Sequence, residues 1–133
     1  MIAKIMKGSG FKGVINHILD PKKGTELIDS SGVRTDSISH IVQSFIDQTE
    51  LNPRVGKVVG HISLSFSAQD SSKLSNEFMA QTAREYMEEM GIKDTQYIIG
   101  RHFDKEHPHV HIAFNRIDNN GKTISDRNDR FRS

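Results

Sequence analysis

The stretch from Lys57 to Phe66 alternates between apolar and polar residues, and it constrains the fold more than any other pattern in the chain. Four apolar residues occupy every second position, with one interruption at Gly60, namely Val58, Ile62, Leu64 and Phe66. The positions between them include His61 and Ser63. Because successive side chains of a strand point to opposite faces, this segment predicts a strand with one apolar and one polar face. Such a strand belongs to a sheet whose apolar face is covered by another layer.

Three segments carry apolar residues at the spacing of an amphipathic helix. The first runs from Phe11 to Leu19 and is stopped by Pro21. Asp36 is predicted to cap the second, whose apolar face extends to Ile46. The third and longest opens at residues 70–72 and closes at Gly91. Its predicted inner stripe is Leu74, Phe78, Met79, Thr82, Tyr86, Met87 and Met90.

The remaining strands are predicted from short apolar segments bounded by turn residues. They are Met1–Met6, Gln96–Arg101 and His109–Ile117, with small strands at Thr25–Ile28 and near Val33. This order of strands and helices is an α+β pattern, and we expect one mainly antiparallel sheet with helices packed on one face. The 133 residues contain no repeat or linker, so residues 1–133 are expected to form one domain.

Composition excludes several classes of protein. No run approaches the roughly 18 apolar residues of a membrane span, and the first residues lack the pattern of a signal peptide, so we expect a cytoplasmic protein. The absence of cysteine excludes disulfide frameworks, thiolate metal sites and cysteine nucleophiles.

The net charge of +1 is the sum of unlike regions. Residues 1–23 hold five lysines and one aspartate, residues 116–133 hold five basic and three acidic residues, and residues 70–94 hold six acidic and three basic ones. If the two basic regions lie on one side of the sheet, they form a surface suited to a phosphate backbone. Ordinary solvated charges give the same counts.

Four of the seven histidines fall within ten residues. His109 and His111 are two apart on a predicted strand and therefore share a face, which His102 joins if the two strands pair as a hairpin. Three neutral imidazoles that converge can bind a divalent ion and leave other positions open, as in a catalytic site. Asp104 or Glu106, in the connecting loop, can accept the second ring N–H of a ligand histidine.

The other histidines are weaker candidates. His61 lies on the polar side of its strand, where it faces either the metal site or a bound partner, and His107 is expected to lie off the strand because Pro108 follows it. For any single histidine, an exposed imidazole without a function is the simpler interpretation. The three at 102, 109 and 111 are singled out by their common spacing.

These residues resemble a known family. His102-x-Asp104, then Pro108-His109-Val110-His111 and Asn115-Arg116, is similar to the histidine-hydrophobic-histidine motif of the HUH relaxases, the mobilisation nucleases that nick plasmids and conjugative transposons. Segments 1–13, 60–66 and 96–99 also resemble this family, so the resemblance spans the chain. It implies an N-terminal nuclease domain of a longer protein.

The resemblance implies a function. A relaxase binds single-stranded DNA at an origin of transfer, breaks one phosphodiester by attack of a side chain, and stays joined to the 5′ phosphate until it reseals the strand. By resemblance His102, His109 and His111 are the ligands of a divalent ion, for which Mg²⁺ or Mn²⁺ is expected. Accessory DNA-processing proteins and type IV coupling proteins are the further partners implied.

The nucleophile departs from the family pattern. Most of these enzymes use a tyrosine on the first helix, where this chain has His17. Three interpretations remain open: His17 attacks and forms a phosphoramidate, the domain binds DNA without cleaving it, or one of the two tyrosines attacks. Tyr86 and Tyr97 both fall at positions that favour packing.

Basic residues near these motifs are candidate DNA contacts. Lys7 and Lys12 flank the glycine-rich loop, and Arg116 follows the histidine motif. Arg127 and Arg130 can track a strand by charge, although a basic tail without a role fits equally well. Asn115 is a weaker candidate beside Arg116.

Two function classes compete with the relaxase hypothesis. The segment from Gly8 to Gly13 reads G-x-G-x-x-G between a strand and a helix, with Asp29 further on, which is the outline of a dinucleotide-binding fingerprint. Against it, Pro21 cuts the helix short and the chain lacks alternating strand and helix units. A DNA-binding module without cleavage and a metallohydrolase with another substrate are the remaining alternatives.

Overall fold

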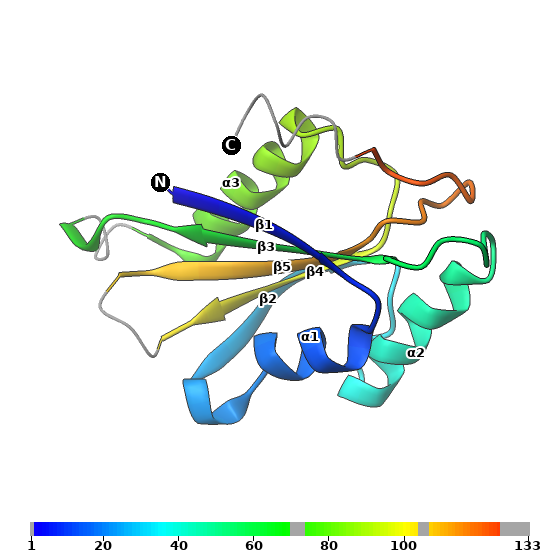
Figure 1. Cartoon of the computed structure of the whole chain (residues 1–133). Helices are drawn as coiled ribbons and strands as arrows, with labels where there is room; N and C mark the ends of the chain where they lie inside the picture. The colour runs from blue at the N-terminus through cyan, green and yellow to red at the C-terminus, as the bar shows by residue number, and fades with distance from the viewer. Residues whose placement is uncertain (1, 70–73, 104–106, 126–133) are drawn as a thin grey trace.

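A computed structural model describes residues 2–69, 74–103 and 107–125 of the chain, and the structural statements below concern these residues. The elements in chain order are β1 (Ile2–Gly8), α1 (Phe11–Ile18), the 3₁₀ helix η1 (Pro21–Lys23), β2 (Thr25–Ser31), α2 (Ile38–Thr49), β3 (Val59–Ser65), α3 (Asn76–Glu89), β4 (Tyr97–His102) and β5 (His109–Asn115). The strands form one sheet in the order β1-β3-β5-β4-β2, and each neighbouring pair is antiparallel (Figure 1).

The predicted α+β class and antiparallel sheet are confirmed, but the helices do not share one face. Val110, Ile112 and Phe114 of β5 pack in a cluster with residues of α3, whereas Ala113 packs in a second cluster with residues of α1 and α2. Because side chains alternate along a strand, these clusters lie on opposite faces of the sheet. Figure 1 shows α3 on one side of the sheet and α1 and α2 on the other. The face predicted to be polar is apolar over half its length, so it also needs a cover.

The layer of α1 and α2 covers that apolar half. Phe11 of α1 and Phe45 of α2 stack with ring centroids 4.7 Å apart, and Ile15 is fully buried beside them. They pack over Ile98 and Ala113 in the middle of the sheet. The polar half of the same face, which carries the histidines, is therefore left outside this apolar contact.

Helix α3 begins later than predicted, and the prediction that Phe78 belongs to its buried stripe is wrong. Residues 70–72, which we expected to open it, lie outside the described residues, and the observed cap is Ser75, whose Oγ accepts from the backbone N–H of Phe78 at 3.0 Å. The Phe78 side chain is 52% exposed, because Met79 and Ala83 face the sheet instead. The predicted end is confirmed, since Gly91 follows the helix with φ 79°.

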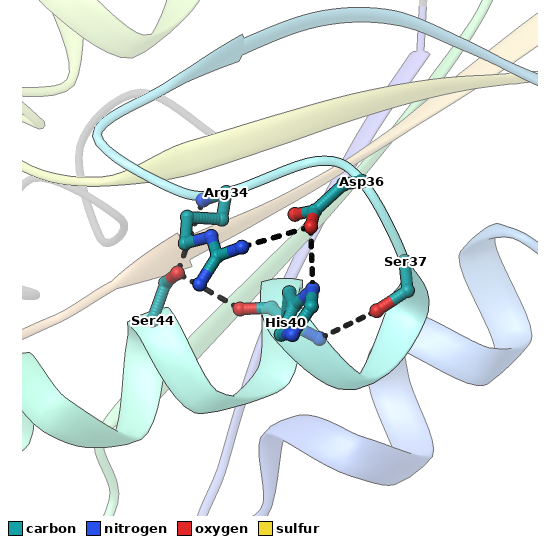
Figure 2. A network of polar contacts seen from close by, with 5 residues as sticks. All are labelled: Arg34, Asp36, Ser37, His40 and Ser44. Atoms are coloured by element: carbon teal, nitrogen blue, oxygen red, sulfur yellow. Dashed lines mark hydrogen bonds and ion pairs between the residues drawn. The ribbon is translucent and has the colours of Figure 1, made fainter.

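Helix α2 also has a different cap from the one predicted. Its N-cap is Ser37, whose Oγ accepts from the backbone N–H of His40 at 3.1 Å. Asp36 instead pairs with Arg34 at 2.9 Å and with His40 Nδ1 at 2.7 Å (Figure 2). In addition, β2 continues through Ser31, beyond the end at Ile28 that the sequence predicted.

Gly100 allows the end of α1 to approach the sheet closely. A Cβ added at Gly100 would lie 2.6 Å from Cγ2 of Ile18 and 3.2 Å from its carbonyl oxygen. The last turn of α1 therefore rests directly on β4, at the position paired with His111 of β5. This contact determines how near α1 comes to the histidines.

We predict that Gly100→Ala destabilises the fold, because the methyl group must displace Ile18. The expected loss is about 1–3 kcal/mol in the free energy of unfolding, measured by urea titration. Gly13→Ala is the matched control, because a Cβ at Gly13 meets no atom within 4 Å and alanine favours a helix. Equal unfolding free energies for wild type and Gly100→Ala would contradict this account of the contact.

Candidate metal centre

Three histidines converge on the face of the sheet that α1 partly covers. β5 lies between β3 and β4, and its register places His109 opposite His102. His111 shares a face with His109, and all three side chains are buried, with exposed fractions of 3%, 5% and 9% for His102, His109 and His111. One ring nitrogen from each lies within 4.8 Å of the others. The predicted hairpin of these strands is confirmed.

Backbone carbonyls fix two of these rings. Nε2 of His102 lies 2.8 Å from the carbonyl oxygen of Ile18, and Nδ1 of His109 lies 3.1 Å from that of His107. A carbonyl oxygen only accepts, so the imidazole nitrogen carries the proton in each bond. The lone pairs of the neutral rings are therefore on Nδ1 of His102 and Nε2 of His109.

His61 fixes the third ring. Its Nε2 lies 2.9 Å from Nδ1 of His111. This leaves Nε2 of His111 as the nitrogen that could bind a metal ion. Burial, followed by the charges of the surrounding histidines, lowers the pKa of His111 to about 2. Burial and the charges of His17 and His102 lower the pKa of His61 to about 4. Both rings are thus neutral at pH 7 and keep their lone pairs.

This donor set fits a divalent metal ion. Ligand histidines in proteins usually donate a hydrogen bond from the second ring N–H to a carbonyl or another polar group, which is the arrangement of His102 and His109. Three imidazole ligands leave further coordination positions for a substrate oxygen. Asp104 and Glu106, the predicted partners of these rings, lie outside the described residues.

His17 lies at the open side of the cluster. It is exposed at the end of α1, and its ring centroid is 5.3 Å from that of His111 and 5.8 Å from that of His102. The sequence placed His17 on the first helix, and the close approach of α1 at Gly100 brings its ring to the histidines. A phosphate at the cluster would therefore be in reach of this imidazole.

Lys23 contacts His17 and was not predicted from the sequence. Its Nζ lies 2.7 Å from Nδ1 of His17. An ammonium group only donates, so Nδ1 accepts and Nε2 carries the proton of the neutral ring. The contact depends on the turn of η1, in which the Asp20 carboxylate accepts from the backbone N–H of Lys22 at 2.9 Å. Pro21 signalled this turn in the sequence, but nothing there indicated where Lys23 would point.

The two tyrosines lie away from the cluster. Tyr97 pairs with Phe114 in the sheet and donates to Asp29 at 3.2 Å, and Tyr86 packs against the core beneath α3. Both belong to the opposite face of the sheet from the histidines. Of the three nucleophile interpretations, the one that uses a tyrosine is therefore at odds with the geometry.

The predicted DNA contacts are dispersed. Lys7 and Arg116 line a small pocket beside the end of α3, on the face opposite the histidines. The Arg116 guanidinium donates to the carbonyl oxygens of Lys57 and Ile124 at 2.8 and 3.0 Å, which favours a structural role. Lys12 is exposed on α1, the helix that carries His17, whereas Arg127 and Arg130 lie outside the described residues.

Asn115, the weaker of the predicted DNA contacts, has a structural role. Its side chain is fully buried, and its amide nitrogen donates to the carbonyl oxygen of Phe45 at 3.0 Å and to Gln96 at 2.9 Å. Its side-chain oxygen accepts from the backbone N–H of Ile117 at 3.0 Å. Asn115 therefore joins α2 to the sheet at the end remote from His109.

Comparison with known families decides the identity of the chain. A family model described as relaxase, MobA/VirD2-like, nuclease domain matches residues 17–133. The matched range contains His17 and the three clustered histidines. The chain belongs to this relaxase family. No curated protein matches the relaxase chain.

Within the part of the chain that the structure describes, no helix is long and apolar enough to cross a membrane.

The dinucleotide-binding alternative is wrong for this relaxase domain. That fingerprint requires a parallel strand-helix-strand unit, with the phosphate at the start of the helix. Here β1 pairs with β3 in the antiparallel direction, and every strand pair of the described sheet is antiparallel. The glycine-rich segment runs from the end of β1 into the first turn of α1.

The buried histidines predict a loss of stability in acid. The pKa of His111 is lowered in the folded state, so below pH 6.5 the unfolded chain binds a proton that the folded chain does not. Between pH 7 and pH 5 this group alone is expected to reduce the free energy of unfolding by about 2 kcal/mol, and His61 acts in the same direction.

Urea titrations in EDTA at the two pH values measure this effect. His111→Gln is expected to lose less stability than wild type between pH 7 and pH 5, because it lacks the titrating group. His107→Gln, at an exposed histidine, is the control and should match wild type. The same pH dependence in His111→Gln as in wild type would contradict the burial of a neutral His111.

Proposed function

We propose that this domain nicks and rejoins one strand of single-stranded DNA at the origin of transfer of a plasmid or conjugative transposon. The reaction is metal-dependent, specific for site and strand, and passes through a covalent link between the protein and the 5′ phosphate. The proposal depends above all on one observation: the His17 ring lies beside a cluster of three buried imidazoles, of which two bond backbone carbonyls and the third bonds His61. Membership of the relaxase family supports it.

His102, His109 and His111 are the residues that would hold the ion. When bound, a divalent cation polarises the scissile phosphate and stabilises the negative charge that develops on its non-bridging oxygens. Imidazole nitrogens suit transition ions better than Mg²⁺, which prefers oxygen ligands, so within the expected pair this donor set favours Mn²⁺. The burial of the three rings excludes water from the protein side of the site.

His17 is the proposed nucleophile. A lone pair of its imidazole attacks phosphorus, the new N–P bond forms as the P–O3′ bond breaks, and the ring loses its N–H proton to solvent while the departing 3′ oxygen takes one up. Resealing reverses these steps, with the 3′ hydroxyl as the attacking group. A phosphoramidate has a high transfer potential, which suits a reversible nick.

Lys23 prepares His17 for this attack. In the free protein its ammonium occupies the Nδ1 lone pair of His17 and keeps the proton on Nε2. A phosphate oxygen is a stronger acceptor for an ammonium than a neutral imidazole is. Bound DNA therefore draws Lys23 to the phosphate and releases Nδ1 as the attacking nitrogen. Lys23 then contributes positive charge where the reaction develops negative charge.

The alternative function is binding of single-stranded DNA without cleavage. The absence of a tyrosine at position 17 favours it, because most relatives attack with that residue. Both functions use the same surface, and they differ only in whether a covalent product forms. Accessory DNA-processing proteins and type IV coupling proteins remain proposed partners on the basis of the family alone.

We predict a covalent adduct when the domain is incubated with Mn²⁺ and a single-stranded oligonucleotide from the origin of transfer of its own replicon. Mass spectrometry should show the adduct, and acid should cleave it as expected for a phosphoramidate. His17→Ala should abolish it, and Lys23→Met should slow its formation by about 100-fold. Lys22→Met, at the neighbouring exposed lysine, is the control and should react at the wild-type rate.

Two outcomes would contradict the proposal. An adduct that persists in His17→Ala removes His17 as the nucleophile. DNA binding by the wild type with no adduct in Mn²⁺ favours the binding module instead.

A further inference from the structure

A groove lies between α1 and the first half of α2, outside the histidine cluster. It encloses about 340 Å³, within the range of small-ligand sites. Figure 1 shows the two helices side by side on the same face of the sheet. Two residues of α1 and four of α2 line it, namely Lys12, Asn16, Ile38, Ser39, Val42 and Gln43.

The wall formed by α2 is held in place by a polar network. Figure 2 shows Asp36 between the side chains of Arg34 and His40, at the first turn of the helix. Ser37 caps that turn, and the Ser44 hydroxyl accepts from the backbone N–H of Arg34 at 3.0 Å. The segment before α2 is thereby tied to the helix at three points. The spacing of the two walls is set by Phe11 of α1, whose ring stacks on that of Phe45 of α2.

The lining of the groove has the chemistry of a nucleotide site. Ile38 is 37% exposed and Val42 is half-buried, which provides an apolar contact for a flat ring. Asn16 and Gln43 carry amides, which pair with base edges, and Gln43 is oriented by its bond to Asp47 at 2.7 Å. Lys12 provides a cation for a phosphate. The described residues that line the groove include no acidic side chain.

The groove and the proposed site of cleavage are linked by neighbouring residues of α1. Asn16, in its wall, immediately precedes His17 on α1. Successive residues of a helix are turned by about 100°, so Asn16 faces α2 while His17 faces the histidines. A DNA strand with its scissile phosphate at His17 would therefore pass close to the groove.

We propose that the α1–α2 groove binds a base of single-stranded DNA next to the scissile phosphate. This inference rests on the proposed function, because the strand reaches the groove through His17. The base lies on Ile38 and Val42, its edge pairs with the amides of Asn16 and Gln43, and Lys12 contacts its phosphate. The groove thereby contributes to the selection of the nick site.

Ser39→Trp tests the groove, because the indole fills it without removing a proposed contact. Gln81→Trp is the matched control, since Gln81 is exposed on α3 across the sheet. The probes are fluorescein-labelled oligo(dA) and oligo(dT), and fluorescence anisotropy measures their dissociation constants. We expect Ser39→Trp to weaken binding of the preferred probe by about tenfold, which corresponds to one lost base contact, and Gln81→Trp to match wild type.

Two variants without added bulk separate recognition from misfolding. Asn16→Ala and Gln43→Ala should each reduce the ratio between the oligo(dA) and oligo(dT) dissociation constants, with circular dichroism equal to that of wild type. In wild-type NMR spectra, oligonucleotide should shift the backbone amide signals of residues 38–43.

The outcomes distinguish this inference from the function on which it rests. Wild-type affinity and base preference in Ser39→Trp, or unshifted signals of residues 38–43, would overturn the groove and leave the relaxase proposal standing. If the wild type binds neither oligonucleotide nor origin DNA, the proposed function itself fails. Binding of oligo-glutamate in the groove with no effect of Ser39→Trp on DNA would assign the groove to an acidic peptide.

Discussion

The antiparallel pairing of β5 with β3 and β4 is the constraint on which the site depends. It places His109 opposite His102 and sets His61 on the same face, where it reaches His111. A shift of one residue would turn His109 and His111 to the α3 side of the sheet. The register is protected by burial of Val110 and Ile112 under α3, so the alternation that forms the core also assembles the histidines.

Burying three imidazoles is costly unless their polar atoms are bonded, and the fold satisfies this need with its own backbone. The carbonyl oxygen of Ile18 is at the end of α1, where the helix supplies no N–H donor, and Nε2 of His102 donates to it. This one hydrogen bond satisfies a carbonyl oxygen at the end of α1, selects the tautomer of His102 and joins α1 to the histidine cluster. The close contact of Ile18 with Gly100 keeps this arrangement compact, and His17 is brought to the site as a consequence.

Much of this was predictable from local patterns. Alternation predicted the strands, and the spacing of His109 and His111 predicted a shared face, because both depend only on neighbours in the chain. The placement of helices on both faces depends on how much of each face is apolar, which the pattern of one strand did not show. The cap at Ser37 was misassigned because aspartate and serine compete at neighbouring positions. The start of α3 was misassigned because the sequence offers serine at 71, 72 and 75, and each is a suitable cap. The contact of Lys23 with His17 depends on the path of η1 in space, and no sequence period encodes it.

We infer that hydrogen bonds of the fold direct three imidazole lone pairs toward one metal ion. Long-range ¹⁵N NMR of the histidine side chains, before and after addition of Zn²⁺, tests it most directly, because it identifies the protonated nitrogen of each ring. We expect a proton on Nε2 of His102 and on Nδ1 of His109. When Zn²⁺ binds, the signals of His102 Nδ1, His109 Nε2 and His111 Nε2 should shift together. The opposite tautomers, or Zn²⁺ shifts at His40 and His107 with these three rings unchanged, would contradict it.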